Sequence, residues 1–158
     1  MKHLLPALVL VIATASCGDW NSGFEFKPPD TSTAPAPYDT TNAVRKVYRA
    51  DGLKIYTVIE GTGTIQISEV DRIYTFYTLR KTNGKVQEST YSDGNTTVPA
   101  LLSMTNLIRG FREGMIGQKQ GARVVLVIPP ALGYGGSATH ALRNDTLRFD
   151  IDVTSILD

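Results

Sequence analysis

The alternation of apolar and polar residues predicts β-strands over most of the second half of the chain. Residues 147–154 are apolar at odd and polar at even positions, so one side of this strand should be buried and the other should face water. An exposed face requires an antiparallel sheet. Residues 73–80 have a second long strand pattern, and the Asn-Gly pair at 83–84 predicts a hairpin that returns through residues 85–89.

Two further runs are rich in β-branched and aromatic residues and are expected to be strands. They cover residues 53–59 and 122–128, and the second is stopped by a Pro-Pro pair. The Gly-x-Gly at 61–63 is interpreted as a turn; a phosphate-binding loop would need a helix pattern after it, which is absent. Residues 131–145 show no period and are expected to form a long loop, of the kind that is often functional.

One short segment has helical spacing instead. Leu107, Ile108 and Phe111 share an apolar face, Thr105 is expected to cap the start, and Gly114 is expected to end the helix in the left-handed conformation. A helix this short is unstable alone, so it must be held by the sheet. The pattern therefore predicts an α+β domain over residues 44–158, with one twisted antiparallel sheet and one short helix on its dry face.

The start of the chain resembles an export signal. Residues 1–16 combine a basic start with an apolar run that is too short to span a bilayer, which needs about 20 residues. Small residues precede a lone cysteine, Cys17, as in the lipobox of bacterial lipoproteins, although Thr14 stands where that family more often has Leu. We expect a signal peptide and lipid attachment at Cys17. The alternative is an ordinary cleavage site beside a chance cysteine.

Residues 17–43 contain several prolines among polar residues and have no helical or strand period. This composition is typical of a disordered tether. We expect it to hold the domain away from the membrane in which the lipid is inserted, on the periplasmic side of a bacterial envelope.

Charge and composition exclude several classes of function. The whole chain has a net charge of +1, and removal of Lys2 with the signal peptide would leave it neutral, so no nucleic-acid partner is expected. His3 and His140 lie far apart in sequence and Cys17 is the only cysteine, so neither a metal site nor a cofactor is expected. We expect a monomer.

Four segments within residues 52–158 resemble the motifs of one family, in order and at nearly its spacing. Residues 107–115, Leu-Ile-Arg-Gly-Phe-Arg-Glu-Gly-Met, resemble the Val-Ile-x-Gly-Trp-x-Glu-Gly helix of FKBP-type peptidyl-prolyl isomerases. Residues 77–89 resemble that family's Tyr-Thr-Gly…Asp-Gly-Lys-x-Phe-Asp-Ser hairpin. Residues 121–135 resemble its Ile-Pro-x-x-x-Ala-Tyr-Gly segment, and residues 144–151 resemble its Asn-x-Thr-Leu-x-Phe-x-Val ending.

The resemblance implies a sheet curled around the helix, a shallow apolar pocket between them, and prolyl isomerase activity on exported proteins. It implies the catalytic positions Tyr77, Glu88, Ile108, Phe111, Tyr134 and Phe149. It implies the substrate-binding positions Gln87, Val98, Leu107, Ala141 and Leu142. In the family, the tyrosine that matches Tyr134 donates its hydroxyl to the substrate, and the backbone N–H that matches Ile108 donates a second bond.

Departures from the family pattern bear on the rim of the pocket. Gln87 stands where the family has Phe, Glu88 stands where it has Asp, and Ala-Leu-Arg at 141–143 replaces Ile-Pro-Pro in a shortened loop. These changes leave a second class of function open, a chaperone or peptide-binding module of the same fold with little or no turnover. A third class of function is that of a structural lipoprotein of the cell envelope.

The reaction itself requires no chemically reactive side chain. Rotation about the bond before proline breaks no covalent bond, so it needs no nucleophile, metal or cofactor. The barrier of about 18–20 kcal/mol comes from amide resonance. Twisting localises the nitrogen lone pair and makes the amide less polar, so an apolar pocket favours the twisted state.

Overall fold

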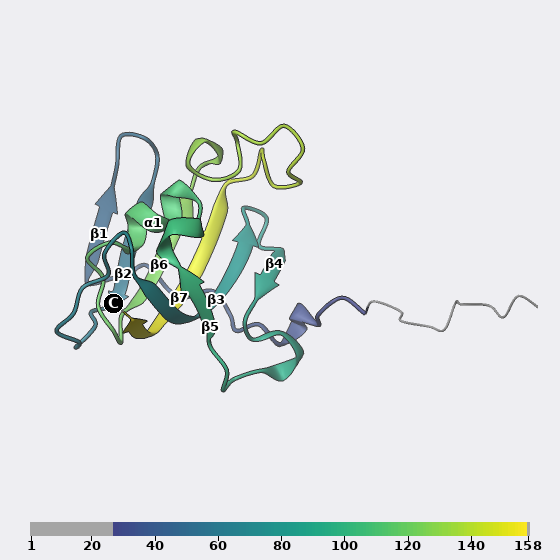
Figure 1. Cartoon of the computed structure of the whole chain (residues 1–158). Helices are drawn as coiled ribbons and strands as arrows, with labels where there is room; N and C mark the ends of the chain where they lie inside the picture. Colours follow the sequence, from purple (N-terminus) through teal and green to yellow (C-terminus); the bar gives the residue numbers. More distant parts are fainter. Residues whose placement is uncertain (1–26, 158) are drawn as a thin grey trace, which may run out of the picture.

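The computed structural model describes residues 27–157 and contains one antiparallel sheet of seven strands (Figure 1). The strand order is β1-β2-β6-β7-β3-β4, and β5 pairs with the start of β3 beside β4. The strands are β1 (Arg45–Tyr48), β2 (Lys54–Ile59), β3 (Arg72–Lys81), β4 (Val86–Ser89), β5 (Ala100–Ser103), β6 (Arg123–Ile128) and β7 (Leu147–Leu157). The expected α+β class and the antiparallel pairing are confirmed.

Two of these strands were not predicted. All four residues of β1 are exposed, so its sequence carries no alternation of buried and exposed positions. The other, β5, has only four residues and no fully buried one. Both strands are recognisable only through their pairing partners, β2 and β3. None of the helices within residues 27–157 combines the length and the apolar composition that a bilayer-spanning helix requires.

The helix begins later than we predicted. A 3₁₀ turn, η3 (Met104–Asn106), comes first, and α1 (Arg109–Met115) follows with Ile108 at its N-cap position, so Thr105 does not cap it. Gly114 does not end the helix either. It lies inside α1 where a β-carbon would approach Leu126 Cδ2 to 2.6 Å, so it is required for close packing on β6. The left-handed residue is Gly117, with φ of 81°.

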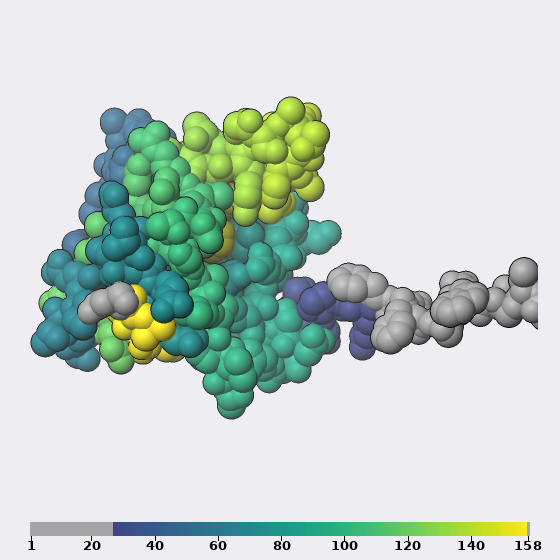
Figure 2. Space-filling model, in the orientation of Figure 1, coloured from purple at the N-terminus to yellow at the C-terminus, as the bar shows by residue number. Residues whose placement is uncertain are grey.

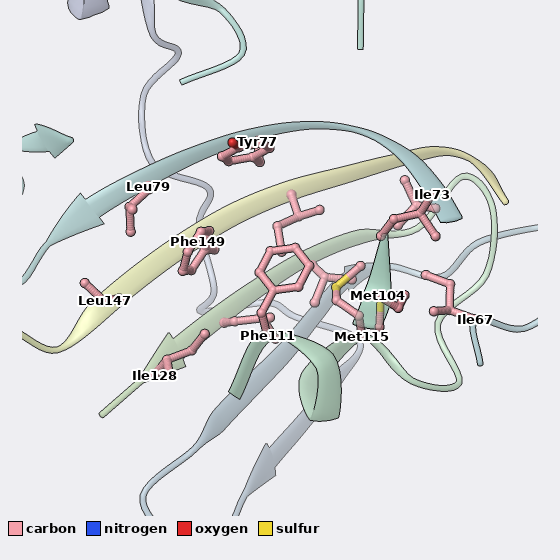
Figure 3. Packing of buried hydrophobic residues seen from close by; sticks show 14 of the residues in the cluster. Ile67, Ile73, Tyr77, Leu79, Met104, Phe111, Met115, Ile128, Leu147 and Phe149 are labelled. Atoms are coloured by element: carbon pink, nitrogen blue, oxygen red, sulfur yellow. The ribbon is translucent and has the colours of Figure 1, made fainter. Parts of the chain in front are cut away.

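The hydrophobic core lies between α1 and the inner face of the sheet (Figure 3). Phe111 points from α1 toward β7, and Met115 lies one turn further along the helix. Leu126 and Ile151, from the two central strands, are fully buried beneath them. Since the helix has only seven residues, this burial and not its own hydrogen bonding accounts for its stability.

The opposite face of the sheet is also covered, which we did not predict. The segment before β1 runs along this outer face, on the side away from α1 (Figure 1). Asp150 of β7 is 2% exposed and Arg80 of β3 is 4% exposed, although the alternation predicted that Asp150 faces water. The expectation of a disordered tether over residues 17–43 is therefore wrong for the part that packs here, from Asp30 to Tyr38. Cys17 and the proposed signal peptide, residues 1–16, lie outside the described residues.

A network of charged and aromatic side chains holds this segment, which we call the N-terminal strap (residues 30–38), on the sheet. Arg80 donates to Asp150 Oδ2 at 2.5 Å and also to the Pro35 carbonyl. Arg148 donates to the Tyr38 carbonyl at 2.6 Å, and the Tyr38 hydroxyl donates to Asp152 at 2.6 Å. These bonds satisfy a buried ion pair that would otherwise be unfavourable in the interior.

Candidate functional site

A cavity of about 250 Å³ opens between the start of α1, the inner face of β3 and β7, and the loop that follows β6. It is lined by Tyr77, Leu79, Glu88, Leu102, Asn106, Leu107, Ile108, Phe111, Tyr134 and Phe149. All six residues that we expected to be catalytic line this one cavity. Their placement agrees with the expectation, and their roles in catalysis stay a prediction.

Three aromatic rings form the floor of the cavity. Phe111 and Phe149 meet edge to face, with ring centroids 5.1 Å apart and planes at 86°, and Tyr77 packs on Phe149 at 6.2 Å (Figure 3). Each of the three side chains is at most 9% exposed. The floor is therefore mostly apolar and shielded from solvent, with the geometry that aromatic pairs prefer.

The one carboxylate of the cavity, Glu88, is held by Tyr77. The Tyr77 hydroxyl donates to Glu88 Oε1 across the β3–β4 pair. Burial, together with this hydrogen bond and the carboxylate charge, raises the pKa of Tyr77 well above its usual value. Tyr77 therefore keeps its proton at neutral pH and orients Glu88.

Tyr134 closes the cavity from the loop after β6. Its ring stacks on that of His140, with centroids 3.7 Å apart and planes within 8°. His140 is fixed in turn, because its Nδ1 accepts the Leu142 N–H at 3.1 Å. Burial raises the pKa of Tyr134, and the charge of Glu88 adds to the effect, so the hydroxyl stays protonated and available as a donor.

Four of the expected substrate-binding residues do not line the cavity, and their role in substrate binding stays a prediction. Val98 is 68% exposed on the loop before β5, and Ala141 is exposed on the loop after β6. Leu142 packs at the edge of the core instead. Gln87 donates its amide to the Val86 carbonyl and lines a separate groove. Only Leu107 of this set lies where it was expected.

Three lining residues were missed. Leu79 follows Tyr77 by two positions on the same strand, so the strand period could have placed it in the cavity. Leu102 comes from β5, which the sequence did not reveal, and Asn106 lies in the turn that we had assigned to the helix. In residues 27–157 no three His, Cys, Asp or Glu side chains are grouped as ligands of a metal would be.

Comparison with known proteins agrees with this geometry. Residues 63–154 match the family model for FKBP-type peptidyl-prolyl cis-trans isomerases. The chain is 34% identical over 92 residues to a probable FKBP-type peptidyl-prolyl cis-trans isomerase of Haemophilus influenzae, and 33% identical over 111 residues to FK506-binding protein 1A of Neurospora crassa. The crystal structure of FkpA from Escherichia coli superposes with a TM-score of 0.63 at 27% identity.

These matches differ in how much of each protein they cover. The Haemophilus match takes in 57% of this chain and 37% of that protein, while the Neurospora match takes in 67% and 89%. The FkpA superposition covers 71% of this chain and 51% of that one. The family model takes in residues 63–154, which include every residue that lines the cavity.

Proposed function

Because the chain belongs to the family of FKBP-type peptidyl-prolyl cis-trans isomerases, we propose that its domain catalyses the cis–trans isomerisation of X–Pro bonds in other polypeptides. The single observation that carries this proposal is the cavity, whose aromatic floor lies beneath a tyrosine hydroxyl and the start of a helix. The proline ring would rest on Phe111 and Phe149. Both rings are buried and contribute no competing hydrogen bonds.

The surroundings of the cavity favour the twisted amide. An amide loses polarity as it twists, and an apolar floor penalises the planar, more polar form relative to the twisted one. Tyr134 would donate its hydroxyl to a carbonyl of the client. Ile108 immediately precedes α1, and the first N–H groups of a helix have no partner inside it, so its backbone is placed to donate a second bond. Glu88, held by Tyr77, would face the carbonyl that rotates.

A direct test uses exchange NMR on a short peptide with one X–Pro bond, with the purified full-length chain in mild detergent. We expect the cis–trans exchange rate to rise in proportion to protein concentration. This assay needs no coupling protease, so cleavage of the enzyme cannot mimic a loss of activity. Exchange at the uncatalysed rate, with peptide resonances still shifted by binding, would contradict the isomerase and support a peptide-binding module.

We also propose that the protein is exported and anchored through a lipid on Cys17, and that its clients are proline-containing segments of exported proteins, bound by a monomer. The support is the basic and apolar start followed by small residues and a lone cysteine. Cys17→Ala should release the protein from membranes or leave it unprocessed, as cell fractionation and mass spectrometry would show. Detergent-dependent membrane association that persists in this variant would contradict the lipid anchor.

A further inference from the structure

A second groove of about 450 Å³ lies next to the cavity and shares one of its residues. One wall is the start of the described chain, with Pro28, Pro29 and Thr31, and the other is formed by β4 and the turn η2 (Ser92–Gly94), with Glu88 and Asp93. Glu88 lines both the groove and the cavity. Figure 2 shows the purple start of the described chain against the teal residues that follow β4. The groove and the cavity are therefore neighbours that meet at Glu88.

The two walls are joined by a set of specific hydrogen bonds. The Asp30 N–H donates to Asp93 Oδ1 at 3.0 Å, and the Asp93 N–H donates back to the Asp30 carbonyl at 2.9 Å. Thr33 Oγ1 donates to the Tyr91 carbonyl at 2.5 Å. Asp93 has φ of 55°, a conformation that few residues other than glycine adopt, so the turn is held by its partners. The groove is a built feature of the fold and not a gap between loose segments.

The groove is acidic and partly apolar. Its lining includes the carboxylates of Glu88 and Asp93 and contains no Lys or Arg. Beside it, hydrogen bonds from Ser32 and, more weakly, the charge of Lys27 lower the pKa of Asp30. Across from these charges, Pro28 and Pro29 present apolar rings. A carboxylate pair facing proline rings suits a lysine or arginine, whose stem packs on apolar surface while its head group stays at the charge.

We propose that this groove binds the residues that flank the client's proline, and that it favours flanks that carry Lys or Arg. The inference rests on the proposed isomerase function, because it places a proline of the same client in the cavity. A chain that leaves the cavity over Glu88 enters the groove directly. In the described residues, β4 ends its side of the sheet, so an extended segment can lie along it. The N-terminal strap would thus take part in client selection.

The test compares three peptides with the same central X–Pro bond and with Lys, Gln or Glu at the flanking positions. With exchange NMR at low salt, we expect kcat/KM for the Lys peptide to exceed that for the Glu peptide by about two- to fivefold, the size of an exposed charge interaction. The ratio should fall toward one in 0.5 M NaCl, because salt screens exposed charges.

The variant Asp93→Asn isolates the groove from the catalytic machinery. Asn tolerates the left-handed conformation and can still accept the Asp30 N–H, so the turn should be kept while the charge is lost. We expect the Lys-to-Glu ratio to drop by about half, with turnover of the Gln peptide unchanged. The matched control is Asp39→Asn, another exposed Asp that accepts a backbone N–H two residues on but does not line the groove. Its ratio should equal that of the natural chain.

The outcomes separate this inference from the function on which it rests. Turnover of all three peptides at equal rates would contradict the proposed role of the groove and would leave the proposed isomerase activity intact. Peptide binding without turnover, but with a Lys preference that Asp93→Asn removes, would support the groove and overturn the isomerase. An equal loss of preference in Asp39→Asn would show that general charge attraction is responsible. No turnover and no binding would overturn both proposals.

Discussion

The two faces of the sheet are built from alternate residues of the same strands, but they are stabilised in different ways. The inner face carries Tyr77 and Phe149 and packs on α1 as an apolar core. The outer face carries the ion pair of Arg80 and Asp150 and is covered by the N-terminal strap through hydrogen bonds. The difference shows that the alternation of apolar and polar residues assigns a side chain to one face of the sheet. It does not decide whether that face is exposed to solvent.

The outer face also joins distant parts of the chain through one carboxylate. Asp152 accepts hydrogen bonds from the hydroxyls of Tyr38 and Tyr91 and from Arg123 Nε at 2.8 Å. The guanidinium of Arg123 lies 4.4 Å from the centre of the Tyr38 ring, within the range of a cation–π contact. Tyr91 belongs to the loop that also builds the acidic groove, so the strap, this loop and β7 form one polar unit.

The largest effect should come from breaking the buried ion pair of the outer face. Asp150→Asn keeps the shape but leaves Arg80 charged and buried, so we expect the free energy of unfolding to fall by about 3–5 kcal/mol. Denaturant unfolding measures this. Glu60→Gln, which loosens the exposed pair with Arg45, is the control and should cost less than about 1 kcal/mol. Similar losses for both would mean that burial of the outer pair does not matter.

Removal of the strap should have the next largest effect. A chain that begins at Val44 lacks Pro35 and Tyr38, so Arg80 and Arg148 lose their carbonyl partners and Asp152 loses a hydroxyl donor. Hydrogen bonds to charged groups contribute about 1.5–3 kcal/mol each, and water will replace part of them, so we expect a loss of about 2–4 kcal/mol. A chain that begins at Lys27 is the control. If both unfold at the same denaturant concentration, the strap does not stabilise the domain.

On the inner face, Tyr134→Phe should separate catalysis from stability. The change removes one hydroxyl and almost no volume, so the free energy of unfolding should change by about 1 kcal/mol or less. The loss of one hydrogen bond to the client, about 1 kcal/mol, should lower kcat/KM about fivefold in the exchange assay. Tyr48→Phe, at a ring that is exposed on β1, is the control. Unchanged turnover in Tyr134→Phe would remove Tyr134 from the proposed site.

The smallest effect is a pH dependence that both faces share. Burial, with a hydrogen bond to a carboxylate, raises the pKa of Tyr38 on the outer face and of Tyr77 on the inner face. A raised pKa in the folded state means that this stability is fully present below about pH 10, where the unfolded tyrosine keeps its proton, and is lost as pH rises further. Tyr38→Phe and Tyr77→Phe should each flatten the decline in unfolding free energy above pH 10. If the unfolding free energy of both variants declined above pH 10 as steeply as that of the natural chain, the two tyrosines would not cause the decline.

Prediction of the site from sequence succeeded where neighbours along a strand or helix decide the outcome. Spacing placed Phe111 and Phe149 on the apolar faces of a helix and a strand, and the resemblance to the family then placed them, with Tyr77, at the cavity that they line. The prediction did not foresee that Val98 and Ala141 lie away from the cavity, on loops whose path depends on what they pack against. Gln87 lines the groove and not the cavity, because a side chain on an edge strand can turn toward either, and the residue itself does not decide which.

The sequence by itself determined the antiparallel sheet, the position of the core residues and the segment that becomes the helix, because these depend on the period of apolar residues, which is a local property. Only the tertiary structure decided that Asp150 is buried, that the helix begins at Arg109, and that residues 30–38 bind the sheet. The burial of Asp150 and the binding of residues 30–38 depend on partners far apart in sequence, up to 114 residues for Tyr38 and Asp152. A polar, proline-containing segment cannot bury enough apolar surface to order itself, and it becomes ordered here because the charges on β3 and β7 supply its hydrogen bonds.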